Sequence, residues 1–344
     1  MERENNMSVI IYGAGTYGRY AYWEYVDKEE ILFFVDRNKS IGGVQGLPLA
    51  VEGPEILEQY PGVPIVIAVC HNQGIRESLE KYGERKFIEY KPLPGINMQD
   101  YVVAKQMRMN NILLQELDKR AVNLGAFIGD EIFLPELSFI HGGSGVLDYA
   151  FIATILKRFH CRTYMEIGSY IGASLNVAAE YCEKCYSLTA AEDSPYHMHE
   201  CCRNWNIPDF SNRLVYKDNI KQFSCIDSKT FDFSMLPGDV DCYFIDGDHS
   251  YEGVWQDTKN VFAHRKTDSI VIWHDLKYTG YVTALAIKQA IGKEFANVYA
   301  VDNNICAVYI PEKFKEMLPV HAWEYTDEKQ PLYVYDTKLV VKVR

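Results

Sequence analysis

The chain has 344 residues, of which 48% are hydrophobic and 24% charged, and its formal net charge is −12. This length favours two domains. The negative charge argues against nucleic acid as a partner, because phosphate contacts need clustered Lys and Arg. No apolar run approaches the ~18 residues of a membrane span, and the polar N-terminus lacks the apolar core of a secretory signal. We therefore expect a cytoplasmic protein without a membrane partner.

Short apolar strands and helix-length segments alternate over residues 1–95. Strands are predicted at residues 8–12, 31–35, 64–69 and 86–90. Alternation of this kind favours a parallel sheet with helices on both faces. The run Pro92-Leu-Pro94-Gly95 then interrupts the pattern, so the first domain is predicted to end there. The fold class is α/β, and this first part is a small Rossmann-like domain for nucleotide binding or docking.

A glycine pattern follows the first of these strands. Gly13, Gly15 and Gly18 precede a helix, and Asp36 ends the next strand, in the spacing of a dinucleotide fingerprint. Alone, it would indicate an NAD(P)-linked oxidoreductase, which is the alternative function. The domain is nevertheless too short for two mononucleotide-binding halves. A candidate nucleotide site and a docking module with a vestigial pocket both stay open.

Residues 96–146 are predicted to be a helical linker. One long helical pattern covers residues 100–123, and residues 141–145 (His-Gly-Gly-Ser-Gly) must form a loop. A helix of this length either bridges the domains or packs against a second subunit. We therefore expect a homo-oligomer.

A second α/β pattern occupies residues 147–310. A helix is predicted at 147–159, and strands at 163–167, 186–190, 213–216, 242–245 and 269–273. Two further strands, 297–301 and 305–310, are joined by Asp302-Asn-Asn304 and fit an antiparallel hairpin. The prediction is a seven-stranded sheet that ends in this hairpin. Residues 311–344 are a C-terminal extension that is predicted to form another hairpin, at 332–335 and 339–343.

Polar residues follow each strand of the second pattern. The first strand contains Glu166 and leads into a turn with Gly168, Ser169 and Gly172, which can approach a ligand closely. The later strands are followed by Glu192, Asp218, Asp246 with His249, and His274 with Asp275. Open α/β sheets bind ligands at the carboxyl ends of their strands, so these residues are predicted to share one cleft.

These motifs resemble the class I S-adenosylmethionine (SAM)-dependent methyltransferases, and within them the macrolide-sugar and catechol-type O-methyltransferases. The specific part is Phe244-Ile-Asp-Gly-Asp-His-Ser-Tyr251 followed by Ile272-Trp-His-Asp275. Tyr170 departs from the pattern, since many members have a glycine there. The resemblance covers about residues 147–310 and implies a second Rossmann-like domain there, with methyl transfer to a hydroxyl of a small polar acceptor such as a sugar. A non-catalytic module that binds SAM or a nucleotide remains an alternative.

The resemblance also implies site residues. Glu166, Gly168 and Gly172, with Ser169 in the same turn, would hold the methionine end of SAM. Glu192 would bind the ribose, Asp218 would bind the adenine, and Asp246 would lie beside the cofactor.

In metal-dependent members, acidic residues after the fourth and fifth strands hold a divalent cation, and here those positions are Asp246, His274 and Asp275. Such a cation lowers the pKa of an acceptor hydroxyl. Mg²⁺ is the first expectation, although His274 fits a softer metal better or serves to orient Asp275. His249 stands where the family places a general base, and an imidazole suits that role near neutral pH.

Nine cysteines are scattered along the chain. Free thiols are the favoured interpretation, because the number is odd and no secretory signal is seen. The cluster Cys182, Cys185, His197, His199, Cys201 and Cys202 gives a weaker hypothesis of a zinc site.

Overall fold

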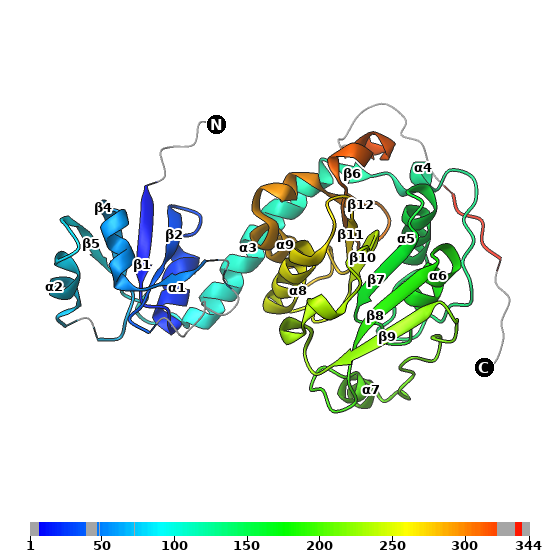
Figure 1. Ribbon diagram of the computed structural model, residues 1–344, viewed down its shortest axis with the longest axis horizontal. Helices are drawn as coiled ribbons and strands as arrows, with labels where there is room; N and C mark the ends of the chain where they lie inside the picture. Colours follow the sequence, from blue (N-terminus) through cyan, green and yellow to red (C-terminus); the bar gives the residue numbers. More distant parts are fainter. Residues whose placement is uncertain (1–6, 39–46, 48, 72, 322–333, 339–344) are drawn as a thin grey trace. The chain divides into compact units, whose positions relative to one another are not determined.

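The computed structural model describes residues 7–38, 47, 49–71, 73–321 and 334–338. The chain divides into two compact units, Met1–Asn111 and Ile112–Arg344, and each has its own sheet (Figure 1). The division falls inside the helix α3, Met98–Asp118, where the sequence predicts a linker. Within the described ranges, no helix combines the length and the hydropathy that crossing a membrane requires.

The first unit is a five-stranded sheet in which every pair of neighbours is parallel. Its strand order is β3-β2-β1-β4-β5. The strands are β1 (Ser8–Tyr12), β2 (Glu30–Val35), β3 (Val51–Glu52), β4 (Gly62–Ile67) and β5 (Arg85–Glu89). The helices are α1 (Thr16–Tyr25), the 3-10 helix η2 (Pro54–Gln59) and α2 (Ile75–Glu80). Four of the five strands lie where the sequence predicts them, and β3 is an addition.

The glycine turn of this unit is a tight backbone contact. Gly13 has a φ of +107°, and a Cβ on Gly18 would clash with the Gly13 carbonyl oxygen. Asp36 holds the turn, because its Oδ2 accepts a hydrogen bond of 2.9 Å from the Ala14 amide. Its Oδ1 accepts another, of 3.0 Å, from the Asn38 amide. The glycine pattern therefore has a structural reason, whether or not a nucleotide binds.

The second unit contains a nine-stranded sheet in the order β14-β6-β12-β13-β11-β10-β7-β8-β9. Its strands are β6 (Ala121–Val122), β7 (Thr163–Ile167), β8 (Lys184–Ala190), β9 (Ile220–Cys225), β10 (Cys242–Ile245), β11 (Ile270–Trp273), β12 (Val298–Val301), β13 (Ala307–Tyr309) and β14 (Val320–His321). The strands β7 to β11 are mutually parallel, and β13 is antiparallel to both β11 and β12.

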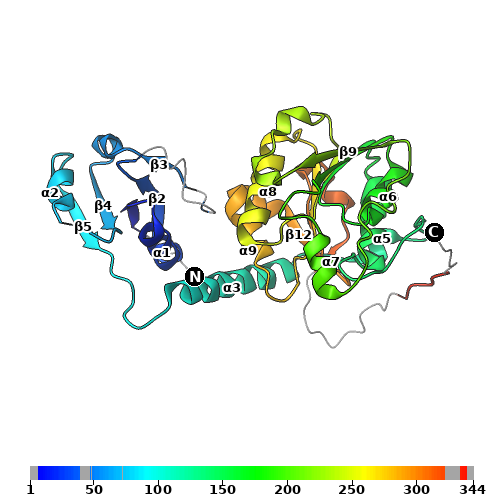
Figure 2. The ribbon, with the colours of Figure 1, turned by 90° about the horizontal axis from the view of Figure 1, so that it is seen from below.

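Helices cover both faces of this sheet (Figure 2). On one side lie α5 (Val146–Arg158) and α6 (Ala173–Tyr181), and on the other lie α8 (Tyr251–His264) and α9 (Thr283–Ile291). The shorter helices are α4 (Leu124–Ile128), α7 (His199–Trp205) and the 3-10 helices η3 (Ser228–Thr230), η4 (Phe233–Met235), η5 (Gly292–Asn297) and η6 (Glu312–Met317). The central strands β10 and β11 are buried at every residue, as continuous apolar runs between two helix layers should be.

Two expectations for this sheet are wrong. The third strand of the parallel series is β9, Ile220–Cys225, and not residues 213–216, which form turns and irregular backbone. The sheet also has more than seven strands, because β6 and β14 extend it beyond β12. The hairpin closure at β12 and β13 is confirmed. The C-terminal hairpin falls mostly outside the described residues, and residues 334–338 have no regular secondary structure.

We predict that Gly18→Ala destabilises the first unit by about 1–3 kcal/mol, because the added methyl group meets backbone that cannot move aside. Gly15→Ala is the matched control, since nothing lies within 4 Å of a Cβ at that position. Urea unfolding of the full chain, followed by circular dichroism, measures both. Equal stability of the two variants would contradict the tight packing of the turn.

Candidate active site

A cavity of about 420 Å³ opens in the second unit at the carboxyl ends of β7, β8, β9 and β10. Its walls are the turn after β7 (167–171), the end of β8 (188–190), the segment after β9 (225–228) and the segment after β10 (246–249). Residues 142–144, from the loop before α5, and residues of α7 complete the lining. The sequence pattern thus places the cavity correctly, because parallel strands bring their following segments to one edge.

The turn after β7 approaches the segment after β10 closely. Gly168 has a φ of +86°, and a Cβ there would overlap the Asp246 carbonyl oxygen. Gly172 also has a φ of +86°, and a Cβ there would clash with the side chain of Val215. Tyr170 has a positive φ of 30°, which explains why a glycine suits this position. The Ser169 side chain is hydrogen-bonded to Ser187 and lines the cavity.

Glu166 lies behind this turn and does not line the cavity. Its side chain is fully buried, and Oε2 accepts hydrogen bonds from Tyr164 (2.9 Å) and Ser174 (2.8 Å). Burial raises the pKa of Glu166 to about 8, although those hydrogen bonds oppose the shift. The structure therefore gives Glu166 a role in supporting the turn.

The residues predicted for adenine and ribose are not in the cavity wall. Asp218 precedes β9, so it lies at the opposite edge of the sheet from the cavity, and this placement is wrong. Glu192 follows β8 as predicted, but it is exposed and does not contribute to the lining. The acidic residue that follows β9 is Asp227, which does line the cavity. A correct position for the third strand would have identified it.

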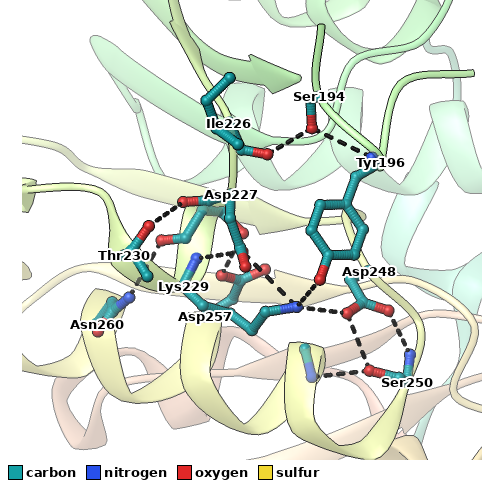
Figure 3. Close-up of polar contacts among 12 residues, drawn as sticks. Ser194, Tyr196, Ile226, Asp227, Lys229, Thr230, Asp248, Ser250, Asp257 and Asn260 are labelled. Atoms are coloured by element: carbon teal, nitrogen blue, oxygen red, sulfur yellow. Dashed lines mark hydrogen bonds and ion pairs between the residues drawn. The ribbon is translucent and has the colours of Figure 1, made fainter. Parts of the chain in front are cut away.

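Lys229 ties three of the cavity segments together, and Figure 3 shows its side chain reaching between Tyr196 and Asp248. Its Nζ donates to Asp248 Oδ2 (2.9 Å) and to the Tyr196 hydroxyl (3.1 Å), and it lies 3.6 Å from Asp227 Oδ1. Burial would lower the pKa of Lys229, but these hydrogen bonds and the carboxylates outweigh it and raise the pKa. The ammonium group therefore stays charged and fixes this wall of the cavity.

His274 lies among three carboxylates. Its Nδ1 is 3.2 Å from Asp246 Oδ1 and 3.3 Å from Asp275 Oδ1, and its Nε2 is 3.5 Å from Asp148 Oδ2. Burial would lower the pKa of His274, but the charge of Asp246 and the hydrogen bonds to the three carboxylates raise it far above its usual value. His274 therefore belongs to the same polar cluster as Asp246 and Asp275. Its assignment as a metal ligand stays a prediction.

His249 lines the cavity and is oriented by a carboxylate. Its Nδ1 lies 3.1 Å from Asp275 Oδ2, and its ring stacks on Tyr281 with centroids 5.2 Å apart. Burial would raise the pKa of Asp275, but His274 and His249 lower it, so this residue is a carboxylate. An imidazole held by a carboxylate at one nitrogen can accept a proton at the other.

Three groups of side chains in the described part of the chain have metal-ligand geometry. In the first, Asp246, His249 and Asp275 offer ligand atoms within 4.8 Å of one another. The second contains Asp148, His274 and Cys306, and burial raises the pKa of the Cys306 thiol well above its usual value. The third contains His197, His199 and Asp209.

The cysteine pair of the zinc hypothesis lies apart from these histidines. Cys182 and Cys185 are buried, and the Cys182 thiol donates to the Cys161 carbonyl (3.3 Å). The neighbouring Cys185 and burial both raise the pKa of Cys182. All nine cysteines are free, as predicted, and this pair belongs to the core.

Residues 165–276 match a protein-family model that is described as a methyltransferase domain. The match begins in β7 and ends just after β11, so it contains the glycine turn, Asp227, Asp246, His249 and Asp275. This part of the chain is therefore a methyltransferase domain, and the expectation from the sequence motifs is confirmed.

The chain has distant similarity to one curated protein and to several solved structures. An uncharacterised protein of Acanthamoeba polyphaga mimivirus is 26% identical over 153 residues, which are 44% of this chain and 65% of that protein. The chain thus spans slightly less than two thirds of this curated relative. A solved TDP-rhamnose 3'-O-methyltransferase of calicheamicin biosynthesis is 15% identical, with a TM-score of 0.34, and the match covers 47% of this chain and 78% of that one.

An O-methyltransferase from Bacillus cereus, solved in complex with S-adenosylhomocysteine (SAH), is 12% identical with a TM-score of 0.37. That match covers 60% of this chain and 90% of the other. Similarity at these TM-scores identifies neither an acceptor nor a metal for this chain.

The buried carboxyl group of Asp257 makes the stability of the chain depend on pH. Asp257 (Figure 3) is fully buried and accepts a hydrogen bond of 2.8 Å from Ser228. Among the described residues, its Oδ2 has no hydrogen-bond partner. Burial raises its pKa to about 7, although Ser228 opposes the shift. The folded chain therefore holds a proton that the unfolded chain releases between about pH 4 and pH 7, so stability falls as pH rises through this window.

Asp257→Asn removes the ionisation, and we expect its stability relative to wild type to improve from pH 4 to pH 8. At about 1.4 kcal/mol per pKa unit, the gain is of the order of 4 kcal/mol. Thermal unfolding at several pH values measures it. If the difference in stability between Asp257→Asn and wild type did not change with pH, Asp257 would not be a buried, protonated carboxyl group.

Proposed function

We propose that the second unit is a SAM-dependent O-methyltransferase that binds SAM in the cavity and uses His249 as its general base. The observation that carries the proposal is the cavity itself. It lies at the carboxyl ends of β7 to β10, inside the matched methyltransferase domain, and its wall contains His249, which Asp275 orients from behind. The acceptor is a small molecule with a hydroxyl group, such as a sugar.

The residues that line the cavity suggest where the methionine end and the adenine end of SAM bind. The turn at Gly168 and Ser169 lets backbone approach the methionine end. Asp227, followed by the 3-10 helix η3, offers a carboxylate to the adenine amino group. The side chains of Tyr196 and Ile226 are 48% and 50% exposed on this wall and offer apolar surface to the adenine ring.

Methyl transfer needs one proton to leave the acceptor. The acceptor oxygen forms a bond to the SAM methyl carbon while the sulfur–carbon bond breaks, and the bonding electrons stay on sulfur to give SAH. The hydroxyl proton passes to His249. Asp275 occupies Nδ1, so Nε2 is the nitrogen that remains for the proton. The Asp275 carboxylate then stabilises the imidazolium that forms.

A divalent cation fits the same site. Asp246 and Asp275 supply the oxygen ligands that Mg²⁺ prefers, and with His249 they have the spacing of a ligand set. Bound there, a cation would lower the pKa of the acceptor hydroxyl. His274 competes with it, because its charge already neutralises part of the carboxylate pair. We keep His249 as the base, since a nitrogen bound to a metal accepts no proton.

The other functions considered are less well supported. An NAD(P)-linked oxidoreductase rests on Gly13, Gly15, Gly18 and Asp36, and both Asp36 oxygens already accept backbone hydrogen bonds. Nucleotide binding by the first unit therefore stays a prediction, as does a homo-oligomer. A non-catalytic SAM-binding module does not account for the oriented His249.

We expect calorimetric titration of the full chain with SAH to give saturable heat, and NADH added beforehand not to compete with SAH. Asp227→Asn should weaken SAH binding, because the adenine contact loses its charge; a hydrogen bond to a charged group is worth about 1.5–3 kcal/mol. Asp218→Asn is the matched control at the far edge of the sheet. SAH binding that is lost in Asp218→Asn and kept in Asp227→Asn would reverse the assignment.

A second prediction concerns the base. With an acceptor found by screening hydroxylated compounds for SAH release, His249→Ala should lower turnover by about a hundredfold to ten-thousandfold and leave SAH affinity unchanged. His160→Asn, an exposed histidine that does not line the cavity, is the control.

Activity in excess chelator measures the cation's part in the same assay. Full activity shows that His249 suffices, and loss that Mg²⁺ restores shows that the Asp246–Asp275 pair holds a cation. Unchanged turnover in His249→Ala would contradict the assignment of the base.

A further inference from the structure

His197, His199 and Asp209 meet at the rim of the cavity and have no part in the chemistry described above. His197 precedes α7, His199 is its first residue, and Asp209 lies in the segment between α7 and β9. One ligand atom from each lies within 4.8 Å of the other two. Of the three, His197 lines the cavity, and Ser211, two residues after Asp209, does so as well.

The two imidazoles are stacked against each other. Their ring centroids are 3.7 Å apart, and the planes are inclined by 33°. The His199 amide donates to His197 Nδ1 (3.3 Å), so this nitrogen carries a lone pair. Two protonated rings would repel at this distance, so the stack is compatible with neutral imidazole, the form that binds metals.

Asp209 is held in place for a ligand role. Its Oδ1 accepts hydrogen bonds from the Ser211 amide (2.8 Å) and the Ser211 hydroxyl (2.6 Å). Its Oδ2 faces His199 Nδ1 at 2.6 Å. Because Ser211 fixes Oδ1, Oδ2 is held toward His199, where it can coordinate an ion together with the imidazole.

We propose that His197, His199 and Asp209 bind a divalent first-row transition-metal ion, of which Zn²⁺ is the representative. Two imidazole nitrogens and one carboxylate oxygen suit such an ion better than Mg²⁺, which prefers oxygen ligands alone. The ion takes the place of the hydrogen bond between His199 and Asp209, and water completes its coordination. It joins the start of α7 to the segment that carries Ser211, and so stabilises one wall of the cavity.

Cobalt titration tests this site, because Co²⁺ bound to nitrogen and oxygen ligands absorbs visible light and Zn²⁺ does not. The full chain is first dialysed against a chelator and then freed of it. We expect one equivalent of Co²⁺ to give a visible band that Zn²⁺ abolishes. Asp209→Asn keeps an acceptor for the Ser211 amide but loses the charge. Loss of an outer-sphere partner lowers metal affinity by about 10–100-fold. Because Asp209 is a direct ligand in this proposal, we expect the Co²⁺ affinity of Asp209→Asn to fall further than that.

Three further variants make the result specific. His199→Ala should abolish the band, and Glu200→Gln, which removes the adjacent charge on α7, should keep it. Asp246→Asn should also keep it, which separates this site from the group formed by Asp246, His249 and Asp275. Zn²⁺ should raise the melting temperature of wild type and not that of Asp209→Asn. No band in wild type, or a band of equal affinity in Asp209→Asn and His199→Ala, would overturn the proposal.

Discussion

The contacts of His274 with three carboxylates are the interaction on which the candidate active site depends. Asp148 in α5, Asp246 after β10 and Asp275 after β11 come from distant parts of the chain, and all three carboxylates face this one imidazole. The Gly145 amide donates to Asp148 (2.7 Å), so the ion pair also fixes the loop that forms one cavity wall. Removing one partner of a buried pair typically costs about 3–5 kcal/mol, because the other charges stay unpaired.

The same interaction positions the base. Asp275 has a φ of +56°, a conformation that is uncommon outside glycine, and its carboxylate contacts both His274 and His249. Strained backbone of this kind persists where surrounding contacts hold it, and it concentrates at functional sites. The histidine after β11 therefore links Asp246 and Asp275, the two carboxylates that a divalent cation would also contact.

Much of this arrangement could be predicted from the sequence. Apolar runs such as 163–167 and 242–245 identify central strands, because strands buried on both faces leave little ambiguity. The partly buried β9 carries polar residues such as Lys221 and Gln222, so its pattern is weak and the nearby run 213–216 predicts a strand in its place. The acidic residue after the third strand is therefore Asp227 and not Asp218. The partners of His274 could not be predicted, because Asp148 lies 126 residues away from it in the sequence.

The central claim is that SAM occupies the cavity at the carboxyl ends of β7 to β10. A crystal structure of the full chain with SAH tests it most directly. We expect the adenine of SAH to lie beside Asp227 and its sulfur to face the side of the cavity that His249 lines. SAH bound at the glycine turn of the first unit, with the cavity of the second unit empty, would contradict it.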